Sequence, residues 1–343
     1  MKMYKNFVVR LALPVVAVMA IAAGVAYAAD ALTLTAAGAT FPYPIYSKWF
    51  DSFHKKTGAQ INYQSIGSGG GIAQLTAGTV DFGASDRPMT DEELGKAPAM
   101  HFPTVLGAVV ATYNVAGNPG DLKLTGDALA GIFMGTIKKW NDKTIAETNA
   151  GVKLPDAPIT VIVRSDNSGT SFVFTDYLSK ANADWKAKVG ANSSPNWPAG
   201  LRGKGSEGVA GLVKQTPNSV GFVELTYALQ NKMAFASIKN SSGKFIKADL
   251  ASTTAAAAGF VKTMPEDFRV SITNAPGATS YPICTFTYLL IPTQVKDAAK
   301  KKTITDFLTW MLKDGQAEAP ALSYAPLPKE VVAKEVKAIA SIK

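Results

Sequence analysis

The stretch Thr104–Asn114, with the sequence TVLGAVVATYN, decides the fold. It is a long run rich in apolar and β-branched residues, which predicts a buried strand. A second run of this kind, Thr285–Ile291, lies towards the other end of the chain, so the two runs bracket its middle. We therefore expect residues 113–285 to form a domain inserted into a domain made of residues 29–112 and 286–343. Two interdomain hinge crossings would then flank a cleft, although strand counting also allows a tandem arrangement.

The rest of the chain alternates short apolar strands with amphipathic helices. This alternation is typical of an α/β fold. The pattern predicts strands over residues 32–35, 61–66, 80–84 and 159–164, and helices over residues 42–56, 72–77, 171–180, 303–312 and 329–342. Residues 67–71 are expected to form a turn, and the alanines at 255–258 a loop or a frayed helix.

Length and composition exclude several classes of protein. The chain has 343 residues, of which 47% are hydrophobic, enough for about two domains with large cores. Cys284 is its one cysteine, so neither an intrachain disulfide nor a zinc ribbon can form. His54 and His101 are its two histidines, which leaves little room for a metal cluster. The composition argues against a metalloenzyme, a disulfide scaffold, a disordered protein and a multispanning membrane protein.

Residues 1–28 have the organisation of a secretory signal peptide. A basic start is followed by an apolar run over residues 11–25 and by Ala26-Tyr27-Ala28, which predicts cleavage after Ala28. The alternative is a membrane anchor, but the apolar run is short for a span of about 20 residues. A cysteine-poor exported protein fits the bacterial periplasm.

The formal net charge of +9 is not concentrated in one segment, as nucleic-acid binding would favour. Such binding calls for lysine and arginine clustered with aromatic residues. Here the basic residues are scattered, and the densest run, Lys300–Lys302, fits a solvated helix surface. We expect no nucleic-acid partner.

Three turns share one design, in which a strand ends, glycine and hydroxyl residues follow, and a helix begins. They are Gly38–Phe41, Gly67–Gly71 and Ser168–Thr170. A helix N-terminus offers unpaired N–H groups and partial positive charge, so each turn is a candidate anion site. Ordinary helix capping is the alternative for each turn taken alone. No Gly-Lys-Ser/Thr closes the glycine run, so it is not a P-loop.

Two charged residues fit the same anion-binding interpretation. Arg164 ends a predicted strand directly before the third turn, where its guanidinium can pair with a tetrahedral oxyanion and Asp166 can orient it. A surface ion pair is the alternative. Asp86 places a carboxylate beside an anion, which makes sense if the ligand carries a proton that Asp86 accepts. Monohydrogen phosphate has such a proton and sulfate has none; a turn-capping role is the alternative for Asp86.

The combination of motifs resembles the periplasmic phosphate-binding proteins of Pst-type ABC transporters. The resemblance covers essentially the whole chain after residue 28. It implies a two-domain type II periplasmic binding protein that binds one inorganic phosphate and delivers it to membrane permease subunits of the importer. The matching segments are Ala37–Pro42, Asn62–Gln64, Gly67–Gly70, Val80–Asp86, Arg164–Phe172, Trp197–Pro198, Gly203–Gly205 and Asn218–Glu224.

The resemblance also implies which residues bind phosphate. Asp166 would hold Arg164, and the binding residues would be Thr40, Phe41, Ser68, Asp86, Arg164, Ser168, Gly169 and Thr170. Arg87 departs from the pattern, since a small residue is expected there; it would lie at the cleft mouth or point into solvent. Residues 240–267 also fit the pattern poorly.

Two other functions compete with a phosphate receptor. A phosphatase or phosphotransferase would need an activated nucleophile or a metal pair, and neither histidine stands in the three turns. A sulfate or molybdate receptor is disfavoured by Asp86. We therefore expect a monomeric binding protein that is not an enzyme and needs no cofactor or metal.

Overall fold

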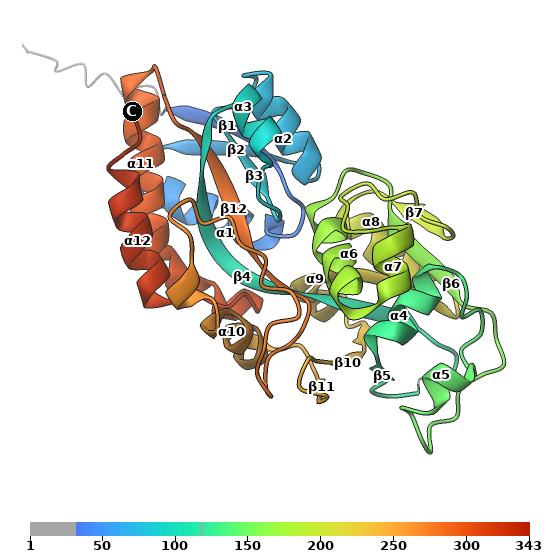
Figure 1. Ribbon diagram of the computed structural model, residues 1–343. Helices are drawn as coiled ribbons and strands as arrows, with labels where there is room; N and C mark the ends of the chain where they lie inside the picture. Colours follow the sequence, from blue (N-terminus) through green and yellow to red (C-terminus); the bar gives the residue numbers. More distant parts are fainter. Residues whose placement is uncertain (1–31, 118) are drawn as a thin grey trace, which may run out of the picture. The chain divides into compact units, whose positions relative to one another are not determined.

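The computed structural model describes residues 32–117 and 119–343, and Leu32–Lys343 form one compact unit (Figure 1). The predicted signal peptide, residues 1–28, and its cleavage point after Ala28 lie outside the described residues. None of the described helices is long and apolar enough to cross a membrane.

A mixed sheet runs through the unit in the strand order β2-β1-β3-β12-β4-β8-β6-β7, with β9 also paired to β4. β1, β2 and β3 pair in parallel, as do β6, β7 and β8, whereas β12 and β4 run antiparallel to their neighbours. The strands are β1 (Thr33–Gly38), β2 (Gln60–Ser65), β3 (Phe82–Ser85), β4 (Ala99–Asn114), β6 (Thr160–Arg164), β7 (Leu201–Gly203), β8 (Ser219–Glu224), β9 (Ala234–Phe235) and β12 (Cys284–Pro292). A small sheet adds β5 (Lys123–Leu124), β10 (Ser237–Lys239) and β11 (Phe245–Ile246).

Helices connect these strands, and their apolar residues face the sheet. In the first helix, for example, Ile45, Trp49 and Phe53 are buried on one face, and Gly58 ends the helix at φ +78°. The helices are α1 (Tyr43–Thr57), α2 (Ser68–Thr76), α3 (Asp91–Lys96), α4 (Gly126–Phe133), α5 (Lys143–Ala146), α6 (Gly169–Ala181), α7 (Ala183–Lys188), α8 (Gly205–Gln215), α9 (Leu225–Gln230), α10 (Leu250–Ala258), α11 (Ala298–Lys313) and α12 (Lys329–Ile339). Short 3₁₀ turns cover Val261–Thr263, Gly315–Glu318 and Pro320–Leu322.

β4 joins the two parallel groups of strands. Its residues 99–108 pair with β12, and its residues 109–114 pair with β8, beginning at Val109 opposite Glu224. β12 pairs with β3 and with residues 99–108 of β4. The second long run of the sequence therefore stays with the first group of strands. The chain returns to β4 just before β12 begins, where the Val109 amide donates to the Ile283 carbonyl at 2.8 Å.

Two local predictions were wrong. Residues 68–71 are not a turn but the first turn of α2, because glycine lets this helix lie directly on β1. A Cβ atom on Gly71 would stand 2.5 Å from the Cα atom of Gly38. Residues 255–258 belong to the regular helix α10, which Asp249 and Ser252 start with a reciprocal capping box. Alanine is the best helix former, so the run continues the helix.

Candidate functional site

The candidate site is built from polar turns at the carboxyl ends of strands. β1 leads to Thr40 and Phe41, β3 leads to Asp86, and β6 ends at Arg164 before the start of α6. Side chains and ligands commonly gather at such strand ends in α/β proteins. The structure brings the residues predicted from the sequence together here. It also adds Thr287 and Ser206, which the sequence reasoning missed.

Asp86 lies at the centre of the site and is 1% exposed. Its Oδ1 accepts a hydrogen bond from the Thr287 hydroxyl at 2.9 Å, and its Oδ2 accepts one from the Thr170 hydroxyl at 3.3 Å. Its amide donates to Ser68 Oγ at 3.1 Å, which leaves the Ser68 hydrogen for another acceptor. The carboxylate is thus held by donors from β12 and α6.

The environment of Asp86 makes its ionised form costly. Burial raises the pKa of Asp86 to about 7, although hydrogen bonds from Thr287 and Thr170 and the positive charge of Arg164 oppose the rise. A carboxyl group with this pKa changes charge near neutral pH. It can therefore accept a proton from a ligand at little cost.

Arg164 is buried and forms a bidentate pair with Asp166. Its Nε donates to Oδ1 at 2.8 Å, and its Nη2 donates to Oδ2 at 2.6 Å. Its Nη1 lies 3.5 Å from Ser206 Oγ, on the side away from Asp166. Burial works to raise the pKa of Asp166, but the hydrogen bonds and charge of Arg164 and the Gly205 amide outweigh burial and hold the pKa below its usual value. Asp166 therefore stays ionised and fixes the guanidinium in one plane.

Thr40 meets the start of α8. Its Oγ1 accepts from the Ser206 amide at 3.2 Å and lies 3.0 Å from Ser206 Oγ. Ser206 was missed by the sequence reasoning, although the glycines before it have the same strand–turn–helix design as the three predicted turns. Phe41 follows Thr40, and its ring packs on Gly107 of β4, where a Cβ atom would stand 2.5 Å from the ring.

The start of α6 lies against the start of α2. Ser168 caps α6 by accepting from the Ser171 amide at 3.0 Å, and Gly169 follows it. A Cβ atom on Gly169 would stand 2.2 Å from Ser68 Oγ and 2.9 Å from the Asp86 nitrogen. The Gly69 amide also donates to the Asn167 carbonyl at 2.9 Å. Glycine at these positions permits backbone-to-backbone contact between segments about 100 residues apart in the sequence.

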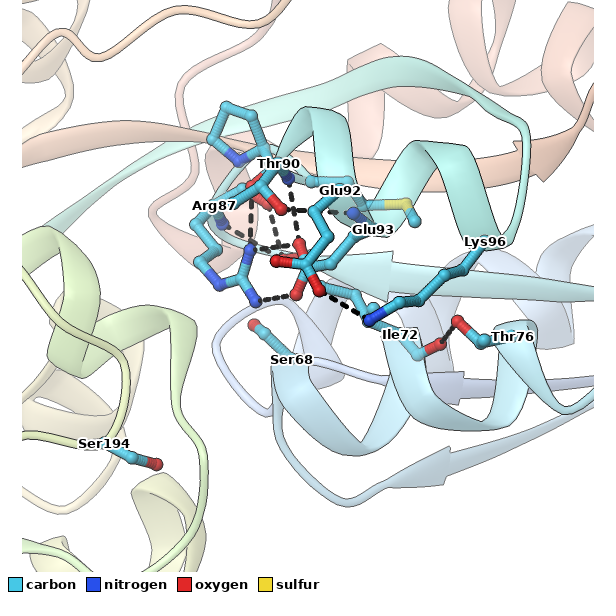
Figure 2. A network of polar contacts seen from close by, with 12 residues as sticks. Ser68, Ile72, Thr76, Arg87, Thr90, Glu92, Glu93, Lys96 and Ser194 are labelled. Carbon is cyan, nitrogen blue, oxygen red and sulfur yellow. Dashed lines mark hydrogen bonds and ion pairs between the residues drawn. The ribbon is translucent and has the colours of Figure 1, made fainter.

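Arg87 does not point into solvent, which was one of its two expected positions. It is 7% exposed, and it pairs with both carboxylate oxygens of Glu93 at 2.6 and 2.8 Å (Figure 2). Glu93 also closes the capping box of α3 with Thr90. Figure 2 shows this cluster beside Ser68, with Lys96 paired to Glu92 at its outer side. The departure from the family pattern is therefore a structural ion pair next to the site.

Both histidines contact backbone groups outside the candidate site. His101 is buried, and its Nε2 accepts from the Met89 amide at 2.9 Å, while burial lowers its pKa to about 4. His54 lies in α1 with its Nδ1 3.2 Å from the Ala59 carbonyl. Over residues 32–117 and 119–343, no group of three or more His, Cys, Asp or Glu side chains is placed to hold a metal ion.

The fold and these turns define a class of binding protein, and comparisons with known proteins agree. A model of the PBP superfamily domain matches residues 23–315. The phosphate-binding protein PstS of Xylella fastidiosa (strain Temecula1) is 47% identical over 306 residues, covering 89% of this chain and 84% of the relative. The PstS protein of Pasteurella multocida (strain Pm70) is 46% identical over 306 residues, covering 89% of each.

Solved structures show the same fold. A high-affinity periplasmic phosphate-binding protein, PfluDING, aligns with a TM-score of 0.73 and 22% identity, covering 90% of this chain and 93% of that one. A phosphate-binding protein from Stenotrophomonas maltophilia aligns with a TM-score of 0.72 and 20% identity, covering 90% and 94%. The fold is that of type II periplasmic binding proteins. The chain belongs to the PBP superfamily and, within it, to the family of phosphate-binding proteins named PstS.

Proposed function

We propose that this chain is a periplasmic receptor that binds one inorganic phosphate and delivers it to the permease subunits of an ABC importer. It acts as a monomer after export and cleavage behind Ala28, and it performs no chemical step on its ligand. Family membership supports this function. The observation that carries it is Asp86, a buried carboxylate that accepts hydrogen bonds from the Thr287 and Thr170 hydroxyls and is close enough to the Arg164 guanidinium to feel its positive charge.

The ligand-binding cage consists of the residues expected from the sequence. Asp86 accepts the proton of monohydrogen phosphate. The groups that donate to the phosphate oxygens are the amides of Thr40, Phe41 and Gly169, the hydroxyls of Thr40, Ser68 and Ser168, and the guanidinium of Arg164 held by Asp166. The Thr170 hydroxyl, which donates to Asp86 in the structure, turns to a phosphate oxygen when the ligand is bound. These groups come from turns on both sides of β4. We therefore assign residues 29–112 and 286–343 to one domain and residues 113–285 to the other, and phosphate draws the two together.

Titration of the purified, phosphate-stripped protein tests this function. At a pH well above 7, where Asp86 is ionised, we expect binding of one phosphate per chain and much weaker binding of sulfate, because sulfate has no proton to share with the Asp86 carboxylate. Calorimetry with both anions at fixed pH and ionic strength measures this. Equal affinity for the two anions, or no binding of phosphate, would overturn the proposal.

Replacing Arg164 with Ala should weaken phosphate binding about 10- to 100-fold, because a hydrogen-bonded charge contributes about 1.5–3 kcal/mol. Arg269→Ala is the matched control. Arg269 also pairs with an aspartate two positions away in the sequence, Asp267, at 2.7 Å, but it contacts none of the proposed binding residues. Phosphate affinity that falls equally in both variants would remove Arg164 from the site.

A further inference from the structure

Three tyrosine hydroxyls bind three consecutive carbonyl groups in the turn between β1 and α1. Tyr63 of β2 donates to the Ala39 carbonyl at 2.7 Å. Tyr227 of α9 donates to the Thr40 carbonyl at 2.6 Å, and Tyr324 donates to the Phe41 carbonyl at 2.6 Å. The three tyrosines come from distant parts of the chain, so tertiary contacts hold this turn in place.

The geometry of the peptide bond connects these contacts to the amides on the other side of the turn. The described chain has no cis peptide bond, so each carbonyl points opposite to the N–H of the following residue in the same plane. The Ala39 carbonyl shares its plane with the Thr40 N–H, and the Thr40 carbonyl shares its plane with the Phe41 N–H. The plane of the Phe41 carbonyl ends at Pro42, which has no N–H.

We propose that Tyr63 and Tyr227 are positioning residues that aim the Thr40 and Phe41 amides at the ligand. This assignment rests on the proposed function. A hydrogen bond on the carbonyl fixes the rotation of its peptide plane, and it also polarises the amide so that the N–H becomes a better donor. Tyr324 anchors the same turn but has no N–H to aim.

The surroundings keep both hydroxyls in place and protonated. The Tyr63 ring stacks on Tyr43 with centroids 6.2 Å apart and meets the edge of Tyr46 at 5.6 Å. Tyr227 OH also lies 3.0 Å from Oε1 of Glu207, an exposed residue; its one hydrogen has the Thr40 carbonyl as the nearer acceptor, at 2.6 Å, and Glu207 as the more distant one. Burial raises the pKa of both tyrosines, so each remains a donor at physiological pH.

The test compares the three Tyr→Phe variants, each of which removes one hydroxyl and keeps the ring. We expect Tyr63→Phe and Tyr227→Phe each to weaken phosphate binding about three- to tenfold, the range for one neutral hydrogen bond. Tyr324→Phe, the matched control, should bind phosphate within about twofold of the native protein while losing as much thermal stability as the others. Calorimetry gives the affinities. In ¹H–¹⁵N spectra, the change of the Thr40 and Phe41 amide resonances on phosphate addition should shrink in the first two variants and persist in Tyr324→Phe.

Each other outcome rejects the assignment. Native affinity and native amide shifts in both Tyr63→Phe and Tyr227→Phe would overturn it. An equal loss of affinity in all three variants would mean that the tyrosines only stabilise the turn. If the native protein itself does not bind phosphate, the proposed function and the assignment both fail. The outcomes above, in which the native protein binds phosphate, reject the assignment alone.

Discussion

Asp86→Asn is expected to narrow the preference for phosphate over sulfate more than any other single substitution. A site built to accept a ligand proton rejects an analogue without one by about 10⁴–10⁵. In the native protein above about pH 7, where Asp86 is ionised, sulfate would face its buried carboxylate with no proton between them. The Asn amide can turn its NH₂ towards sulfate and removes the negative charge, while phosphate can still donate to the amide oxygen.

The preference of the native protein for phosphate over sulfate should also depend on pH. Because the pKa of Asp86 is raised to about 7, the group is ionised above this pH and neutral below it. Sulfate binds best when Asp86 holds a proton, so sulfate binding takes up a proton at higher pH. Linkage then makes sulfate affinity rise as pH falls, by up to about tenfold per pH unit above pH 7, and level off below. Phosphate brings its own proton and should show a weaker dependence.

Competitive titration of the native protein and Asp86→Asn with both anions, at several pH values, measures these effects. In the Asn variant the pH dependence of sulfate binding should disappear, since the amide does not titrate. If the Asn variant rejects sulfate as strongly as the native protein does, Asp86 does not recognise the ligand by its proton.

Gly169→Ala is expected to weaken phosphate binding on the order of 100-fold by holding α6 away from α2. The added Cβ atom would stand 2.2 Å from Ser68 Oγ and 2.9 Å from the Asp86 nitrogen, so the segments must separate. Gly169 does not have a positive φ, so alanine fits its backbone and steric overlap is the only cost. The separation would pull Thr170 and Ser168 out of reach of a ligand bound to Ser68.

Gly211→Ala in α8 is the matched control, because a Cβ atom there meets nothing within 4 Å. It should leave phosphate affinity unchanged. Solution scattering adds a second measurement: saturation with phosphate should reduce the radius of gyration of the native protein and the control, but not of Gly169→Ala. Native affinity in Gly169→Ala would contradict the close approach of α6 and α2 in the bound form.

Residue patterns predicted the parts of the fold that depend on local sequence. The alternation of strands and helices and the strand–turn–helix segments around Thr40, Ser68 and Ser168 are visible because each is a continuous stretch with its own periodicity and turn residues. The ligand-binding roles of these residues remain predictions. The helix over residues 72–77 was predicted, but the first turn of α2, residues 68–71, was missed because a glycine run indicates a turn, and only the close contact of this helix with β1 explains the glycines.

The missing parts of the site depend on distant contacts. Thr287 lies in an apolar strand, where threonine is common for its β propensity, and only the antiparallel placement of β12 next to β3 brings its hydroxyl to Asp86. Tyr227 and Tyr324 are equally inconspicuous in the sequence. Arg87 was misplaced for the same reason, because its partner Glu93 is known only once α3 has turned back on β3.

The packing of the Phe41 ring on Gly107 places the ligand-binding turn directly over the point where β4 changes partners. Pairing with β12 ends at Ala108, and pairing with β8 begins at Val109. In the proposed closure, the two domains would turn about backbone dihedrals of β4 near this point, next to the Phe41 ring. If phosphate shifts the Thr40–Phe41 turn as it binds, that shift would act directly on the part of β4 that passes from one group of strands to the other.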